Sequence, residues 1–312
     1  MPNYTEDFRG VVSLKLDGEA LAKAREFCID EYRDHLIYRE LAAREKNPQR
    51  REILERLSSE EYEHYLFWRK ILNQECEARI SRLFLWIVVI SRLILGLTFT
   101  LKMLERGEES TIEEYRRFLP LLQGDEKREL ESIIGDEEKH ERELMSQIDE
   151  AVVRYMSFIV LGLADAIVEI TGVHAGFLGV TSSTLVAGIA GLVVGFSAAI
   201  SMASAAYLQA KHDVEKNPVS SALTTGLSYI GAVAVLAAPY FITHSMIIAF
   251  TVSVSLAVTL IATFTFYGSV VFDKKFLSEF LESTGLMLGT AFAAYFFGEL
   301  LGSYFGIRGV LG

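Results

Sequence analysis

Long apolar runs recur through the second half of this chain. They cover residues 155–178, 184–209, 220–242, 245–271 and 284–306. Each run is close to, or longer than, the ~20 residues that an α-helix needs to cross a bilayer. The pattern predicts five transmembrane helices joined by short polar turns, so we expect an all-α fold.

Residues 1–150 have a different composition. They carry 24 Lys and Arg and 33 Asp and Glu, whereas residues 151–312 carry only 6 and 8. We therefore expect two domains, 1–150 in water and 151–312 in the membrane. The acidic balance of the first domain argues against nucleic acid as a partner and suits cations. Its first 30 residues are polar and lack the apolar core of a signal peptide, so none is expected.

Two Glu-x-x-His motifs lie in the first domain, Glu61 to His64 and Glu137 to His140. A step of three residues puts the carboxylate and the imidazole on one face of a helix, so both can reach one metal ion. Di-iron carboxylate bundles use two such motifs and one further glutamate from each of two other helices. The motifs therefore predict half of a di-metal site inside a four-helix bundle.

Candidates for the other half stand upstream of each motif. Glu31 lies 30 residues before Glu61, and Glu108 lies 29 residues before Glu137. Glu105, one turn before Glu108 on the same helical face, is a second choice for that ligand. The spacing predicts that the first domain is a doubled helix pair, with one ligand set from each pair.

A tyrosine follows each upstream glutamate after six intervening residues, at Tyr38 and Tyr115. We expect their hydroxyl groups to bond metal-bound carboxylates and fix their orientation, with plain core filling as the alternative. For the ligands themselves the alternative is a set of solvated charges on surface helices. The repeated order of Glu, Tyr and Glu-x-x-His favours the metal site.

A sixth apolar run, residues 83–103, is about long enough to cross a membrane but carries Arg92 near its centre. One crossing here would put Glu61 and His64 on the opposite side from Glu137 and His140. Because all ligands of one site must share a compartment, we expect a long helix that does not cross. Its apolar surface would pack in the bundle, in a dimer interface or along the bilayer surface.

The basic residues of the connecting segments indicate the orientation of the second domain. Lys211 and Lys216 fall between the second and third runs, and Lys274 and Lys275 between the fourth and fifth. By the positive-inside rule these joins face the cytosol together with Arg154 and the first domain. The C-terminus is then expected outside.

The first apolar run contains two carboxylates, Asp165 and Glu169, which a spacing of four puts on one helix face. Ionisable residues inside a span are costly and indicate function. Met202 in the second run stands among serines, and its thioether is a soft ligand suited to late first-row metals. We expect a divalent cation path at these residues. The alternatives are a snorkelling or bonded acid pair and a methionine that only packs.

The remaining chemistry-bearing residues have plainer expectations. Cys28 and Cys76 are the only cysteines and are not a C-x-x-C pair, so we expect packing residues in a reducing compartment. His174 falls near the end of the first run, where we expect it at the membrane interface.

These residues carry a family resemblance. Residues 155–306 resemble the vacuolar iron transporter family through the stretch Gly162 to Ala166 with Glu169 and Gly172, and through Ser201 to Ser204 leading to Tyr207. Residues 20–150 resemble rubrerythrin-like ferritin domains through Glu31, Tyr38 and both Glu-x-x-His motifs. The combination is similar to the membrane-bound ferritin proteins of prokaryotes.

The resemblance implies a homodimer in the prokaryotic inner membrane that exports Fe²⁺ or Mn²⁺ from the cytosol against protons. Asp165 and Met202 would be ligands of the translocation path, and Glu105 and Glu108 would exchange as ligands of a di-iron site. Two departures stand out. Residues 193–196 lack the acidic residue that some relatives carry, so Glu169 would supply the second carboxylate. The insert that eukaryotic relatives carry between the second and third spans shrinks here to residues 212–217.

The expected function is thus an iron exporter whose ferritin-like domain collects, senses or oxidises the metal. The leading alternative is a membrane-anchored di-iron oxidase or peroxidase that transports nothing. A third possibility is a sensor domain that binds metal only to gate the pore. Carboxylate and imidazole ligands suit both iron and manganese, so the sequence does not rank the two metals.

Overall fold

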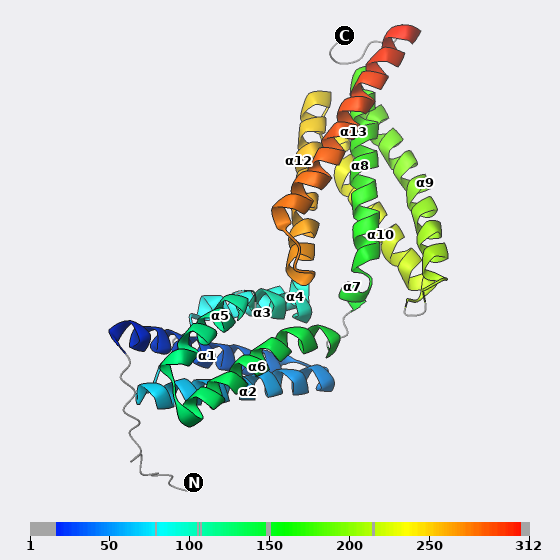
Figure 1. Ribbon diagram of the computed structural model, residues 1–312. Coiled ribbons are helices and arrows are strands. Elements are labelled where there is room, and N and C mark those ends of the chain that lie inside the picture. The colour runs from blue at the N-terminus through cyan, green and yellow to red at the C-terminus, as the bar shows by residue number, and fades with distance from the viewer. Residues whose placement is uncertain are drawn as a thin grey trace. The chain divides into compact units, whose positions relative to one another are not determined.

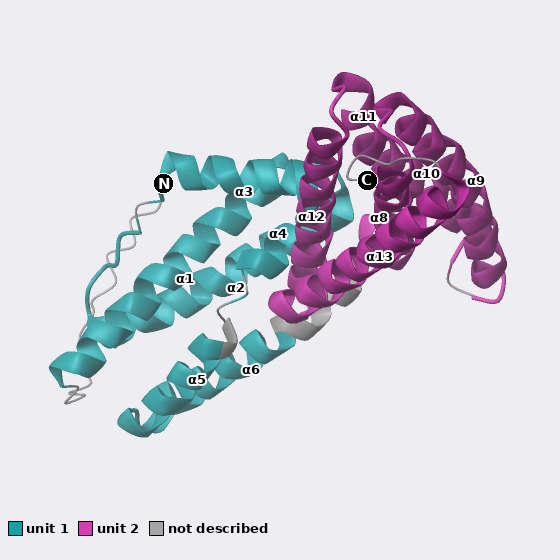
Figure 2. Ribbon diagram, turned by 90° about the horizontal axis from the view of Figure 1, so that it is seen from above, with its two compact units in different colours: residues 1–148 teal, residues 149–312 magenta. Residues whose placement is uncertain are grey.

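The computed structural model describes residues 17–78, 80–104, 106, 108–147, 151–213 and 216–306, without the side chains of 108, 109 and 140–147. The chain divides into two compact units, 1–148 and 149–312 (Figure 2), and each is described by itself. Every regular element among the described residues is a helix (Figure 1). The expected all-α fold class is confirmed.

Two helix pairs form the bundle of unit 1. In the first, α1 (Gly18–Arg44) packs along α2 (Pro48–Leu72) after a loop of three residues. In the second, α5 (Glu108–Phe118) leads through the short 3₁₀ helix η2 (Leu119–Leu121) to α6 (Gly124–Gln147). The Asp17 side chain accepts a hydrogen bond from the Ala20 amide, and Asn47 caps α2 in the same way. These caps satisfy amide groups that a helix start leaves unbonded.

Aromatic side chains from α1, α2 and α5 line the first core of unit 1. Trp68 of α2 is fully buried and lies against Phe27 of α1 and Phe118 of α5, with ring centroids 4.8 Å and 5.1 Å away. Tyr115 of α5 completes the group, 4.7 Å from Phe27. Burial of such large rings favours the bundle and holds its helices in register.

We expected the apolar run at 83–103 to form one long helix, but the structure shows two. The run forms α3 (Arg82–Leu95) and α4 (Leu97–Leu104), separated by Gly96, whose φ of 93° suits a residue without a Cβ. Arg92 pairs with Glu45 of unit 1 at 2.7 Å. Val88, Leu97 and Leu101 enter the second core of this unit. At 14 residues, α3 is also too short to cross a bilayer.

Cys28 and Cys76 form a disulfide, so the expectation of two reduced packing residues is wrong. Cys28 lies in α1 and Cys76 follows α2, with Cα atoms 6.0 Å apart. That separation is in the range a disulfide requires. Because the two residues are 48 positions apart, nothing local in the sequence pairs them.

The described residues of unit 2 include five helical segments long and apolar enough to cross a membrane. After the short α7 (Ala151–Arg154) come α8 (Met156–Val180), α9 (Thr184–Ala210), and α10 (Pro218–Ala237) with α11 (Pro239–Ile242). They are followed by α12 (Met246–Val271) and α13 (Phe276–Phe305). The five expected runs match these segments except at the last, which begins at Phe276 instead of 284.

Glycines let α8 and α13 come into backbone contact. A Cβ atom on Gly298 would lie 2.2 Å from the carbonyl oxygen of Gly176, and one on Gly179 would lie 2.7 Å from the Glu299 amide nitrogen. Small residues allow this approach, and close packing drives helix association in lipid. The first and last spans are therefore fixed against each other.

We expected His174 at the membrane interface, but the structure buries it fully inside unit 2. Its ring lies 4.0 Å from the Tyr240 ring, measured between centroids. It fits only because residue 191 is glycine, since a Cβ there would lie 2.4 Å from the imidazole Nε2.

Candidate metal centre

Four of the expected ligands come together inside unit 1. Glu31 from α1, Glu61 and His64 from α2, and Glu137 from α6 each offer one ligand atom, and these atoms lie within 4.8 Å of one another. All four side chains are buried, none more than 5% exposed. A cluster of this kind is costly to bury without a compensating cation.

His64 lies close to all three carboxylates of this cluster. Its Nδ1 lies 3.0 Å from Glu137, 3.6 Å from Glu31 and 3.7 Å from Glu61. The Glu61 and His64 side chains reach the same point because a step of three residues keeps them on one helix face. Glu31 and Glu137 come from α1 and α6, which both pack against α2.

The fourth bundle helix supplies a hydrogen bond to this cluster. Tyr115 of α5 donates its hydroxyl hydrogen to Glu31, and both groups are buried. Burial raises the pKa of the Tyr115 hydroxyl well above its ordinary value, and the negative charge of Glu31 raises it further. Tyr115 therefore stays protonated and acts as a donor that orients the Glu31 carboxylate.

Burial and crowding shift the pKa values of the groups in this cluster. Burial raises the pKa of Glu61 well above its ordinary value, and the nearby charge of Glu137 adds to the effect. Burial alone would lower the pKa of His64, but the carboxylates of Glu137, Glu31 and Glu61 beside its ring raise it well above its ordinary value. A divalent cation bound at these atoms would therefore compete with protons for them. Oxygen and imidazole donors of this kind fit iron or manganese.

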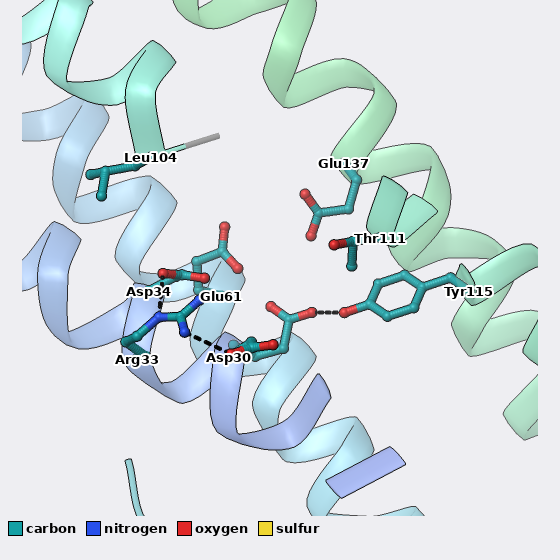
Figure 3. A pocket seen from close by; sticks show the side chains of 9 residues that line it. Asp30, Arg33, Asp34, Glu61, Leu104, Thr111, Tyr115 and Glu137 are labelled. Carbon is teal, nitrogen blue, oxygen red and sulfur yellow. Dashed lines mark hydrogen bonds and ion pairs between the residues drawn. The ribbon is translucent and has the colours of Figure 1, made fainter. Parts of the chain in front are cut away.

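A small cavity of about 100 Å³ opens beside the ligands. Figure 3 shows the Glu61 and Glu137 carboxylates and the Tyr115 hydroxyl turned toward it. On its other side Arg33 pairs with Asp30 at 2.7 Å and with Asp34 at 3.4 Å. These side chains are partly exposed, so they line a polar approach from water to the buried cluster.

Several expected site residues fall outside the described part of the chain. Glu105 lies there altogether, and the side chains of Glu108 and His140 do too, although α5 begins at Glu108 and α6 contains His140. Tyr38 is buried in the second core of unit 1, beside Ile37 and Leu41. The role of these four residues at the site stays a prediction.

In unit 2 the expected path residues lie on the first two spans. Glu169 of α8 accepts a hydrogen bond from Tyr229 of α10, which is fully buried. Met202 of α9 is partly buried and packs against the same core cluster as Tyr229. Asp165, one turn before Glu169, is exposed on the surface of this single chain. The structure thus bonds Glu169 to Tyr229, packs Met202 against the core cluster that contains Tyr229, and leaves Asp165 exposed.

Sequence reasoning missed Tyr229 and the Asp30, Arg33 and Asp34 group. Tyr229 is 60 residues from its partner and stands in an apolar run, so only the fold reveals the contact. The three charged residues gave a signal, because Asp30 and Asp34 flank Glu31 on the first helix. In so charged a domain that signal is not specific.

Comparison with known proteins supports the assignment of unit 1. Residues 19–148 match the Rubrerythrin family model, so this unit is a ferritin-like domain of the rubrerythrin type. The membrane unit lies outside the matched residues. No curated protein and no solved structure matches the chain.

Proposed function

We propose that this chain exports a divalent cation, Fe²⁺ or Mn²⁺, across a membrane, and that its ferritin-like unit collects the metal beforehand. One observation carries the proposal. The chain joins a buried cluster of Glu31, Glu61, His64 and Glu137 to a membrane unit whose first span contains Asp165 and Glu169. Metal-type ligands in both halves indicate that both halves handle the same cation.

In unit 1 the four clustered residues would hold the metal, with Glu105, Glu108 and His140 as further ligands. Iron bound there would supply redox chemistry toward O₂ or peroxide. The chain's own residues do the positioning: Tyr115 fixes the Glu31 carboxylate. Asp30 and Asp34 attract cations to the cavity, while Arg33 limits the net charge at its mouth.

In unit 2 we propose Asp165, Glu169 and Met202 as the translocation path. Charge inside a membrane is tolerated where it pairs or lines a watery path. Tyr229 holds Glu169 by a hydrogen bond, and Met202 offers a soft ligand one helix away. A cation moving past them exchanges water for carboxylate and thioether ligands, and protons moving the other way would reset the carboxylates.

The exposure of Asp165 supports a homodimer. A carboxylate facing lipid from the middle of a span is costly, whereas a second copy would cover it and let two such carboxylates face one path. Cross-linking of a cysteine placed beside Asp165, at Leu161, tests this in native membranes. Absence of a dimer there would contradict the arrangement.

We propose that unit 1 lies in the cytosol of a prokaryotic cell and the C-terminus outside, on the strength of the four lysines in the connecting segments. The disulfide favours the opposite side, because such bonds persist mainly in oxidising compartments. A Ser132→Cys variant distinguishes the two orientations, because Ser132 is exposed on α6. A membrane-impermeant maleimide should label it only after permeabilisation, and labelling of intact cells would reverse the orientation.

A second candidate function is a membrane-anchored di-iron oxidase or peroxidase. The observation that favours it is the cluster itself, because its four described ligands all come from unit 1. An anchor, however, needs no carboxylates inside a span, and Glu169 is held there by a dedicated hydrogen bond. We therefore rank transport first.

Flux measurements on purified protein in proteoliposomes separate the two candidates. With a fluorescent chelator inside, wild type should move Fe²⁺ or Mn²⁺ and Asp165→Asn should abolish the flux. Glu282→Gln, an exposed acid of α13, is the matched control and should keep it. A Glu61→Gln and Glu137→Gln double variant shows whether the ferritin-like unit is required. No flux from wild type under any pH gradient would favour the anchored enzyme.

A further inference from the structure

Helix α3 exposes a continuous apolar face to its surroundings. Trp86 is 64% exposed, Leu93 72% and Ile94 74%. With them on the same helix stand further exposed apolar residues at steps of three and four, and together they form what we call the α3 stripe: Leu83, Trp86, Ile87, Ile90, Leu93 and Ile94. Steps of three and four keep side chains on one face of a helix.

The opposite face of α3 is fixed to unit 1. Val88 is buried in its second core, and Arg92 pairs with Glu45. The helix therefore cannot roll to hide its stripe without breaking a partly buried ion pair and removing Val88 from the core. A groove of about 510 Å³, lined mostly by apolar side chains, runs beside the helix; Ile87 of the stripe and the neighbouring Phe84 line it. Such a surface on a water-facing domain indicates a binding site.

Charge around the stripe differs from that of the rest of the domain. Residues 79–104 contain four basic residues and no acidic residue, inside a half-chain that carries 33 acidic residues. Arg82, at the start of α3, is exposed next to Leu83. A long cationic side chain at the edge of an apolar face can reach lipid phosphates while its stem lies on the acyl chains. Trp86 adds a side chain that favours the headgroup region.

A short connection joins the domain that carries this surface to the first membrane-length helix. Only eight residues, 148–155, separate the end of α6 from the start of α8, the first membrane-length helix. Even fully extended they reach roughly 30 Å. Unit 1 therefore remains within reach of the membrane at all times, so binding of its apolar face needs no encounter from solution.

We propose that α3 lies in the interface of the bilayer, with its stripe among the acyl chains just below the headgroups and Arg82 on anionic lipid phosphates. The proposal does not depend on transport by unit 2. It holds unit 1 against the membrane that the chain spans. A second copy of the chain on the stripe is the competing occupant, and the acid-free charge pattern with its exposed arginine favours lipid.

The test uses the full chain in vesicles of phosphatidylcholine and phosphatidylglycerol with brominated acyl chains. Trp68 and Trp86 are the only tryptophans. In a Trp68→Phe variant, Trp86 fluorescence should be quenched, and more strongly by bromine atoms near the headgroup than by those near the bilayer centre. In the matched Trp86→Phe variant, the buried Trp68 should not be quenched. An unquenched Trp86 would overturn the proposal.

A second measurement keeps the test independent of Trp68, which is a core residue. A nitroxide on Leu93→Cys can be attached selectively, because both native cysteines are in the disulfide. It should collide readily with oxygen and poorly with an aqueous nickel complex, while a nitroxide on exposed Ser132→Cys should show the reverse. Frequent collisions of the nickel complex with the nitroxide at residue 93 would show that the stripe faces water. Spin–spin broadening between two labels would put a second copy there, and either result overturns the proposal.

Discussion

Tyr115 and Glu31 are 84 residues apart and joined by a buried hydrogen bond, which ties the two helix pairs of unit 1 together at the metal cluster. The Tyr115 hydroxyl has a carboxylate acceptor that is also a candidate ligand. A donor in this position decides which way the carboxylate points and how much negative charge it offers a metal.

Replacing that hydroxyl should weaken metal binding without unfolding the bundle. Tyr115→Phe keeps the ring that packs on Phe27 and Trp68 and removes only the donor. We expect affinity for Mn²⁺ to fall by about 10- to 100-fold, as for other partners of metal ligands. Anaerobic titration of the purified protein measures it. Tyr62→Phe is the control, since Tyr62 is 39% exposed, and an equal loss there would contradict the role of Tyr115.

The crowded cluster predicts an unusual dependence of stability on pH. Glu61 and His64 both have a raised pKa in the folded, metal-free unit. A group that binds its proton more tightly when folded stabilises the fold at low pH, and this contribution is lost as the pH rises through its folded pKa. Metal-free unit 1 should therefore lose stability as the pH rises above 4.5, the ordinary glutamate value.

Bound metal should reverse that trend, because it competes with protons for the same atoms. Thermal unfolding followed by tryptophan fluorescence, between about pH 5 and pH 8, with chelator or with saturating Mn²⁺, measures both curves. The difference in unfolding temperature between the metal-bound and the metal-free protein should increase with pH. Glu61→Gln should flatten the metal-free curve and Glu55→Gln, exposed on the same helix, should not. An unfolding temperature of the metal-free protein that does not change with pH would contradict the raised pKa values of the cluster.

The contact between α8 and α13 predicts a sharp difference between two glycines of one helix. Gly298→Ala would place its Cβ 2.2 Å from the Gly176 carbonyl oxygen, whereas a Cβ on Gly285 meets nothing within 4 Å. Overpacking of this kind costs about 1–3 kcal/mol. We expect Gly298→Ala to lower the unfolding temperature of the detergent-solubilised protein and Gly285→Ala to leave it near wild type. Equal behaviour of the two variants would contradict the packing.

The disulfide should contribute strongly to the stability of unit 1. Cys28 and Cys76 enclose a loop of 48 residues, for which the chain-entropy model gives about 4 kcal/mol. A Cys28→Ala and Cys76→Ala double variant should unfold at a lower temperature, and reduction of wild type should lower it by a similar amount. Two free thiols titrated in the untreated native protein would show instead that the bond does not form.

Local spacing was enough to predict the parts of the site that one helix carries. Glu61 and His64 meet because they are three residues apart, and the pairing of Glu31 with this motif follows from the length of a helix hairpin. The five membrane-length helices likewise follow from apolar runs near the thickness of a bilayer. In each case the pattern extends over neighbouring residues, so no tertiary contact was needed to infer it.

The features that the sequence did not predict depend on contacts between distant segments. Cys28 meets Cys76 only because α1 and α2 pack side by side, and His174 is buried only because Gly191 leaves room for its ring. The apolar run around Arg92 has the hydropathy of a long helix. The break at Gly96 divides it into two helices, and the ion pair of Arg92 with Glu45 attaches the first of them to α1 and α2 of unit 1.

The hydrogen bond from Tyr229 to Glu169 gives the sharpest test inside the membrane unit. Tyr229→Phe should leave the packing of the fully buried ring unchanged but free the carboxylate to change rotamer. We expect the concentration of Mn²⁺ at half-maximal flux to rise about tenfold, the lower end of the effect of losing such a partner. Tyr207→Phe, with a 40% exposed ring on α9, should match wild type. Unchanged flux in both variants would remove Glu169 from the proposed path and leave Asp165 and Met202 to be tested alone.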